Sequence, residues 1–270
     1  MHTMRQALTE GVLHSGAAKK LAGRLNWAVQ YLFHRLGRAM IRPIYDQAYS
    51  RFVNALHCVC VQDPLGFAYS RNGSVGKELR VALTWWLWAL GLDIMEERPW
   101  TSADEPLAHL FVDARGSPAH CAAVLFIDGR TLFTDGRPSQ EHMEQFRKRA
   151  DNQIMSLEIL AIVVGLSTFT EELRGRKVIL WSDNTGAESA ARKGSAHSFD
   201  HCLLIHSIWS HALANRMALW IERVASASNI SDLPSRECYG LLNEFDDVVW
   251  REPKVAHLHV EHAPRGASSV

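Results

Sequence analysis

The sequence predicts an α/β fold: a five-stranded mixed sheet with flanking helices, preceded by a mostly helical segment. Apolar residues recur at helical spacing as far as about residue 92, whereas short runs of β type begin near residue 107. The second and third strands after the change are joined by an Asp-Gly turn at Asp128–Gly129, which is typical of a hairpin. Helical stretches separate the later strands, which predicts crossover connections and a mixed sheet.

Three regions are expected along the chain: a helical segment over residues 1–100, an α/β domain over 101–240 and a loose polar tail over 241–270. The boundary is placed in the charged, proline-bounded stretch "EERPWTSADEP" at residues 96–106. In the first region, helices are expected at 15–33, with Ser15 as a cap, at 42–56, and at 77–92. The last is apolar nearly all round, which predicts that it lies between other elements.

In the second region, strands and helices follow one another in an order that fits hairpins first and crossovers later. Strands are expected at 108–116, 121–129, 130–136, 177–182 and 218–225. A long helix is expected at 152–175, with Asn152 as a plausible cap, and another at 198–216.

Composition excludes some classes of protein and leaves others open. The 270 residues are 47% hydrophobic and 21% charged, with 29 basic and 29 acidic residues, which is ordinary for a globular chain with a real core. The first hundred residues carry twelve basic and seven acidic groups, a weak bias towards polyanions. The apolar run at 81–92 is too short to cross a bilayer, which needs roughly 20 residues.

No secretory signal opens the sequence, and five cysteines at irregular spacing fit a reducing compartment. The expectation is an intracellular protein, cytoplasmic or nuclear, without membrane association.

Four acids fall at strand ends or inside an apolar helix: Asp113 in "LFVDARG", Glu158 in "MSLEILA", Asp183 after "VILWS" and Asp232 in "NISDLPSR". Each has a structural alternative. Asp113 and Asp232 can serve turns, Asp183 can cap the helix that follows it, and Glu158 can face solvent at a helix edge. Asp128 and Asp135 each precede a glycine and are interpreted as turn residues only.

A carboxylate within an apolar helix is costly to bury unless it is paired or binds a metal, and carboxylates that converge raise one another's pKa. Divalent cations relieve that repulsion, and Mg²⁺ prefers oxygen ligands and tolerates a site with few carboxylates. Two such ions about 4 Å apart activate water and stabilise the leaving oxygen of a phosphodiester. The four acids therefore predict a site for two Mg²⁺ ions, with Mn²⁺ as a substitute.

The order of the acids resembles that of ribonuclease H domains, with Asp in strand one, Glu in the first helix, Asp after strand four and Asp after strand five. The similarity is to the domains of retroelement reverse transcriptases, of the DIRS-like and Ty3-like groups, carried by "FVDARG", "SLEILAI", "WSDNTGA" and "NISDLPSR" over about residues 107–236. Upstream, "KKLAGRLNWAVQYLFHRLGRAMIRPIYD" and "LRVALTWWLWAL" are similar to the thumb and connection regions of those polymerases.

This resemblance implies a ribonuclease H-type hydrolase that cuts the RNA strand of RNA–DNA hybrids. Asp113, Glu158 and Asp183 would hold the metals and Asp232 would complete the second site. Asn184 and Thr185 would lie near the substrate, where a polar side chain can contact a ribose 2′-hydroxyl. Phosphate contacts are expected from a basic group in the first region: Lys19, Lys20, Arg24, Arg35, Arg38 and Arg42. The partners implied are a hybrid or other nucleic acid and the remaining domains of a reverse transcriptase.

The chain lacks the paired-aspartate motif of a polymerase palm, since its only adjacent pair, Asp246–Asp247, follows the last of the four acids. The expectation is that it does not polymerise by itself and is a fragment, a subunit or a host-adopted remnant. The alternative function is accordingly a non-catalytic scaffold that binds nucleic acid or protein. The loop "VASASNIS" also lacks the histidine that retroviral domains often carry before the last acid.

The sequence also contains two weaker candidates for a metal site and one candidate for a stacking surface. The histidines His197, His201, His206 and His211 could bind zinc, and "CVC" at 58–60 could be half of a metal site, but neither has a strong metal spacing. The tryptophans Trp85, Trp86 and Trp88 could stack on bases, although packing against a neighbouring helix is the favoured interpretation.

Overall fold

The computed structural model describes residues 1–30, 35–49, 73–92, 107–151, 153–245 and 247–255. They fall into two compact units, one within Met1–Glu97 and the other within Arg98–Leu258. The predicted boundary at 96–106 and the cysteines at 58–60 lie outside these described ranges. Among the helices described, none is long and apolar enough to cross a membrane.

The first unit is helical, as predicted, but it contains one helix more than the sequence indicated. Its helices are α1 (His2–Glu10), α2 (Ser15–Ala28), α3 (Arg38–Tyr49) and α4 (Lys77–Ala89), and α1 was not predicted. The prediction of Ser15 as a side-chain cap is wrong: it is the first helical residue, and no side chain caps the helix. Helix α4 is not enclosed on all sides, because Arg80 and Thr84 are exposed.

The core of this unit forms where α3 packs against α2 and α4. Trp86 is fully buried, and its indole N–H donates to the carbonyl oxygen of Met40 at 3.3 Å. Trp85 is buried as well and meets Trp86 edge to face. These two tryptophans therefore pack between helices, as the favoured interpretation had it, and are not surfaces for stacking bases.

The second unit is α/β, with a mixed sheet of six strands in the order β5-β4-β1-β2-β3-β6. The strands are β1 (Leu107–Gly116), β2 (Ala119–Ile127), β3 (Arg130–Gly136), β4 (Lys177–Ser182), β5 (Ala218–Arg223) and β6 (Val248–Trp250). Strands β1, β2 and β3 form an antiparallel meander, while β4 and β5 are added in parallel to β1. The predicted count of five strands is wrong by one.

The additional strand arises in the region predicted to be a loose polar tail. Residues 248–250 pair in parallel with Thr131–Phe133 of β3, and the N–H of Arg251 donates to the carbonyl oxygen of Phe133. A short 3₁₀ helix, η3 (Leu242–Glu244), precedes them. The described part of the tail is structured because it satisfies the hydrogen-bonding groups at the free edge of β3.

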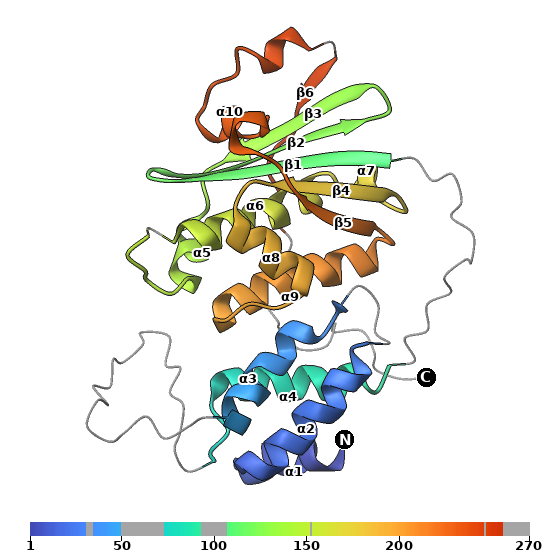
Figure 1. The fold of residues 1–270 in the computed structure, drawn as a ribbon, viewed down its shortest axis with the longest axis vertical. Coiled ribbons are helices and arrows are strands. Elements are labelled where there is room, and N and C mark those ends of the chain that lie inside the picture. Colours follow the sequence, from blue (N-terminus) through green and yellow to red (C-terminus); the bar gives the residue numbers. More distant parts are fainter. Residues whose placement is uncertain (31–34, 50–72, 93–106, 152, 246, 256–270) are drawn as a thin grey trace. The chain divides into compact units, whose positions relative to one another are not determined.

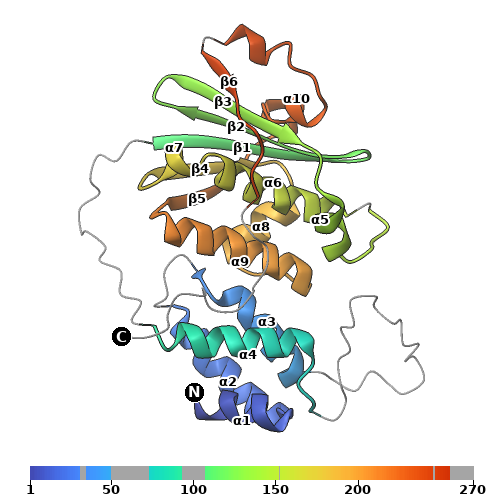
Figure 2. The ribbon, with the colours of Figure 1, turned by 180° about the vertical axis from the view of Figure 1, so that it is seen from behind.

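Helices cover one face of this sheet more fully than the other (Figure 1). Helix α6 (Ile154–Thr168) packs on β1 and β2 and carries α9 (Phe199–Ala214) on its outer side, whereas α8 (Thr185–Lys193) packs beside it on β5. The short helix α10 (Asp232–Ser235) lies on the opposite face, over β1 to β3. The view from behind shows α5 (Gln140–Gln145) and α7 (Thr170–Leu173) on the same side as α6 (Figure 2).

Helix α6 lies unusually close to the sheet. A Cβ at Gly165 would stand 3.0 Å from the Cβ of Ala123 and 3.3 Å from the side chain of Leu110. Nearly every residue of α6 is buried, which explains its continuous apolar sequence. The single predicted helix over 152–175 is in fact divided at Phe169 into α6 and α7.

The two Asp-Gly pairs prove to have different roles. Asp128 and Gly129 both have positive φ (51° and 74°) in the tight β2–β3 turn, as predicted. Asp135 is not a turn residue, contrary to the prediction. It lies within β3 opposite Ala122, and its carboxylate accepts hydrogen bonds from Tyr239 and Trp250 and faces the ring nitrogen of His120 at 2.9 Å.

Candidate metal centre

Asp113 lies inside β1, paired with Ala122 of β2, and only 5% of it is exposed. It is therefore not a turn residue. The hydroxyl of Ser235 in α10 donates to the carbonyl oxygen of Asp232 at 3.1 Å and lies near enough to Asp113 to lower the pKa of its carboxyl. Burial raises the pKa of Asp113 to about 6, opposed by Ser235 and reinforced by the charge of Asp183.

Glu158 projects from the second turn of α6 and is also only 5% exposed, so the solvent-facing alternative is wrong. The side chain of Asn184 and the backbone N–H of Ala114 hydrogen-bond to its carboxylate, yet Oε2 is buried and has no partner. Burial, together with the charges of Asp113 and Asp183, raises the pKa of Glu158 to about 9. A buried carboxylate oxygen without a donor is costly unless another positive group binds it.

Asp183 follows directly after β4, where the chain leaves the sheet for α8. It does not cap that helix. The cap is Asn184, whose side-chain oxygen accepts from the N–H of Ala187 at 3.0 Å. The amide of Asn229 donates to Oδ1 of Asp183 at 3.3 Å and to the carbonyl oxygen of Val112 at 3.0 Å. Asn229 thereby links Asp183 to the backbone of β1.

Three carboxylates converge at this place. One oxygen each from Asp113, Glu158 and Asp183 lies within 4.8 Å of the others. No basic side chain of the described residues is recorded in a hydrogen bond or ion pair with any of the three. The group could hold a divalent cation, because such a cation would neutralise the mutual repulsion and supply a partner for Glu158 Oε2.

The fourth predicted ligand, Asp232, is not a member of this convergent group. It begins α10, and its Oδ1 accepts from Nε of Arg236 at 2.8 Å. Its charge still contributes to the raised pKa of Asp113. The carboxylate of Asp232 is thus within electrostatic reach of the centre, but it is bound to an arginine.

The remaining predicted contact residues lie in two places. Thr185 is the exposed first residue of α8, next to the half-buried Asn184. Lys19, Lys20 and Arg24 are all exposed on α2 in the first unit, and Nζ of Lys19 stands 5.2 Å above the ring centre of Tyr49.

The histidines of α9 do not form a metal site. His201 and His206 are buried, and the Nε2 of His201 lies 2.8 Å from the hydroxyl of Ser156. Burial lowers the pKa of His206 to about 4. His197 is exposed, and His211 contacts Thr170. In the part of the chain that is described, the only His, Cys, Asp and Glu group that could hold a metal is the acid triad.

Sequence reasoning missed three residues around the centre: Asn229, Ser235 and Arg236. Asn229 is buried and bridges Val112, Asp183 and the hydroxyl of Ser231. All three occur in "NISDLPSR", so proximity to Asp232 was the available signal. Arg236 and Ser235 bond within this stretch, to Asp232, whereas the partners of Asn229 are up to 117 residues away in the chain and have no local signal.

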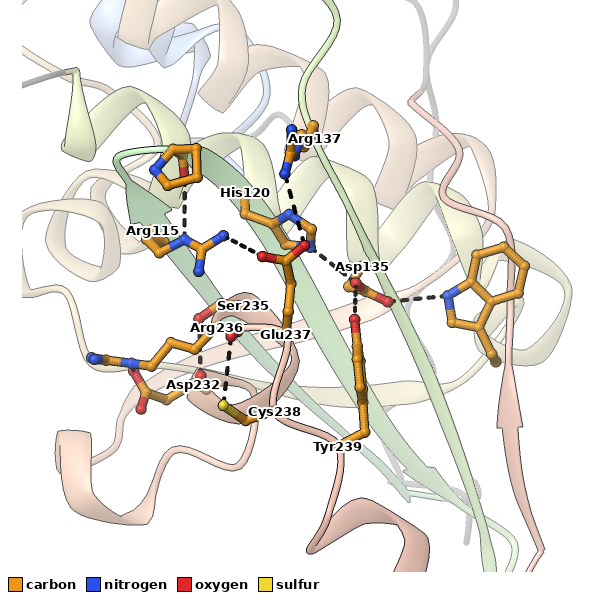
Figure 3. A network of polar contacts seen from close by, with 12 residues as sticks. Arg115, His120, Asp135, Arg137, Asp232, Ser235, Arg236, Glu237, Cys238 and Tyr239 are labelled. Carbon is orange, nitrogen blue, oxygen red and sulfur yellow. Dashed lines mark hydrogen bonds and ion pairs between the residues drawn. The ribbon is translucent and has the colours of Figure 1, made fainter.

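A polar network fastens the segment after Asp232 to the sheet (Figure 3). Nη2 of Arg115 donates to Glu237 at 2.8 Å, and the hydroxyl of Tyr239 donates to Asp135 at 2.8 Å. The sheet residues in these two bonds, Arg115 of β1 and Asp135 of β3, lie on strands of the antiparallel meander. The network therefore holds the backbone around α10 at a fixed place on the sheet.

A scan against protein-family models and a search of curated proteins both find no match for this chain.

Proposed function

We propose that this chain is a metal-dependent endonuclease that hydrolyses the RNA strand of RNA–DNA hybrids, as part of a retroelement reverse transcriptase. The observation that carries the proposal is the convergence of Asp113, Glu158 and Asp183 within 4.8 Å, with a buried oxygen of Glu158 left without a partner. The sheet order and the placement of these acids on β1, α6 and the end of β4 are compatible with a ribonuclease H-like fold.

The chemistry of the donors fits a hard divalent cation such as Mg²⁺, with Mn²⁺ as a substitute, since all three ligands are carboxylate oxygens. When bound, a pair of such ions would activate water and stabilise the charge that develops on the leaving oxygen of a phosphodiester. Asp113, Glu158 and Asp183 would hold the ions, and Asp232 would contribute to the second position.

The protein's own part is to keep these carboxylates in place before the substrate arrives. Asn184 links Glu158 to the cap of α8, and Asn229 links Asp183 to β1. The hydroxyl of Ser235 in α10 lies near Asp113 and lowers the pKa of its carboxyl. Such preorganisation reduces the rearrangement needed during the reaction.

Recognition of the hybrid would come from two regions. Thr185 and Asn184, at the start of α8, are placed next to the acids and offer polar side chains to a ribose 2′-hydroxyl. Lys19, Lys20 and Arg24 present exposed positive charge suited to phosphates.

The test is hydrolysis of an end-labelled RNA–DNA hybrid with and without Mg²⁺. We expect cleavage of the RNA strand only with the cation, and no cleavage of a DNA duplex of the same sequence. Binding of the hybrid without any Mg²⁺- or Mn²⁺-dependent cleavage would favour the alternative, a non-catalytic scaffold.

A further inference from the structure

One acid near the centre is already neutralised by a side chain of the chain itself. Asp232 and Arg236 occupy opposite ends of one turn of α10, and Oδ1 of Asp232 lies 2.8 Å from Nε of Arg236 (Figure 3). Within the described ranges, none of the other three acids is paired with an arginine. A carboxylate oxygen engaged by a guanidinium is a poorer ligand for a cation, because the two positive charges would compete for it.

The backbone that carries the pair is fixed on both sides to β1. Asn229 ties the start of this segment to the carbonyl oxygen of Val112, and Glu237 at its end pairs with Arg115. The side chain of Arg236 itself is 64% exposed. Release of Asp232 therefore requires rotation of one side chain and no displacement of α10.

The ion pair between Asp232 and Arg236 is also weak enough for a metal cation to replace the arginine. Asp232 is 33% exposed on its side chain, and exposed pairs at i,i+4 typically contribute only about 0.3–0.5 kcal/mol. The site that Asp232 would serve lies beside Asp113, whose pKa responds to both the Asp232 and the Arg236 charge. The guanidinium of Arg236 would therefore hinder the binding of a second cation in two ways: it pairs with the carboxylate of Asp232, and its positive charge repels the cation.

We propose that Arg236 is an exchangeable counter-ion of Asp232, which must be displaced before a second divalent cation can bind beside the acid triad. This inference rests on the proposed function and adds to it the order in which the two cations bind. The triad takes the first cation without rearrangement, and the second enters only in competition with Arg236.

The test is titration of the intact chain with Mn²⁺ alone, with bound and free ion counted by electron paramagnetic resonance. Arg236→Met keeps an unbranched, flexible side chain and removes the guanidinium and its charge. We expect the first ion to bind equally well in both proteins and the second to bind about two- to fivefold more tightly in Arg236→Met, since loss of an exposed charge pair changes affinity by up to about 1 kcal/mol. Arg236→Lys retains the charge and should resemble the wild type.

Two matched variants complete the experiment. Arg174→Met removes another arginine from an exposed helical pair, with Glu171 at 3.1 Å, and should change neither affinity. Asp232→Asn removes the carboxylate for which Arg236 and the second ion compete, so it should lower the affinity for the second ion. In the double variant, Arg236→Met should then cause no further change in that affinity. Thermal unfolding checks that each variant is folded, and the exposed position of Arg236 predicts little change there.

The outcomes separate the two proposals. A second Mn²⁺ that binds no more tightly in Arg236→Met overturns the role of Arg236 and leaves the cation site standing. A wild-type chain that binds no Mn²⁺ at all overturns the cation site and the inference together.

Discussion

Two acidic groups of the second unit have opposite surroundings: Asp200, in the first turn of α9, and the triad around Glu158 of α6. Asp200 is 7% exposed and pairs with Arg149 at 2.8 Å, while the backbone N–H of Arg147 donates to its other oxygen. Burial would raise the pKa of Asp200, but these hydrogen bonds outweigh it and lower the pKa to about 2. The carboxylates of the triad are buried or half-buried and face one another instead.

The comparison distinguishes an acid that stabilises the fold from acids that are held ready for a ligand. Asp200 has its counter-charge and its donors within the chain, so it needs nothing further. Glu158 and Asp113 have raised pKa values and one orphan oxygen, which is the pattern expected when the partner is a cation from solution. Burial alone would not have separated the two groups.

The largest expected effect is on catalysis. Asp183→Asn and Glu158→Gln keep side-chain shape and remove charge, and a neutral amide is a poor ligand for a hard cation. Hybrid cleavage should fall by several orders of magnitude in each. In the absence of metal, thermal stability should hold or rise, because a repelling carboxylate has been removed.

The control for these variants is Asp128→Asn in the β2–β3 turn. Asn tolerates the positive φ of this position, and the exposed ion pair with Arg176 contributes little. Equal loss of cleavage in all three variants would point to general misfolding and would leave the metal centre unsupported.

The second effect is a loss of stability, whereas the triad variants should keep or gain stability without metal. Asp200→Asn leaves the guanidinium of Arg149, whose side chain is 23% exposed, without its counter-charge. We expect a loss of up to about 3 kcal/mol in the free energy of unfolding, measured with urea. Affinity for Mn²⁺ should be unchanged under conditions where the variant is folded. A change in the first Mn²⁺ affinity larger than that in Asp128→Asn would contradict the separation of the two groups.

The third effect concerns pH. The folded chain keeps protons on Asp113 up to about pH 6 and on Glu158 up to about pH 9, whereas unfolded carboxyls lose theirs near about pH 4. The folded state therefore binds more protons in this window, so its stability without metal should decline as pH rises from about 4 to 9. Asp200, with its lowered pKa, contributes stability above about pH 4 that is lost as pH falls towards 2.

Melting temperatures measured across pH, with and without Mg²⁺, test this expectation. The cation should flatten the decline, and Glu158→Gln should reduce it in the absence of metal. A melting temperature that rises between pH 5 and 8 without metal would contradict the raised pKa values.

The smallest effect concerns basic side chains that are exposed on the surface of α2. Replacing Lys19, Lys20 and Arg24 together by glutamine should leave stability nearly unchanged, since all three are exposed. If they contact phosphates, the log–log salt dependence of hybrid binding should flatten by roughly 0.7–0.9 per lost contact. An unchanged slope would assign them to a solvated helix face.

The sequence located Asp113, Glu158 and Asp183 on a strand, on a helix and at a strand end because an apolar run marks each of these elements. Sequence reasoning failed where a local signal competes with a distant partner. Asp135 precedes a glycine and looks like a turn residue, but β3 continues through it because β2 is long enough to pair with it. The sixth strand was missed for the same reason: β6 has three residues, and only the edge of β3 gives it a partner.

The neighbours of the acids could not be predicted either. Whether a buried aspartate meets an arginine or another aspartate depends on contacts across the sheet, such as that of Asn229 with Val112. Asp232 shows the limit most clearly. Its place after the fifth strand was predicted, but its pairing with Arg236 became evident only from the structure of α10.

The close packing of α6 against the sheet affects the position of Glu158 at the candidate metal centre. Gly165 and Glu158 are seven residues apart, two helical turns along the same face of α6. A methyl group at Gly165 would meet the Cβ of Ala123, which cannot rotate away, so the helix would have to rise from the sheet. Glu158 would rise with it and withdraw from Asp113 and Asp183. The spacing of the carboxylates, and with it the size of ion that they could hold, is therefore set about 10 Å away, by the absence of one side chain.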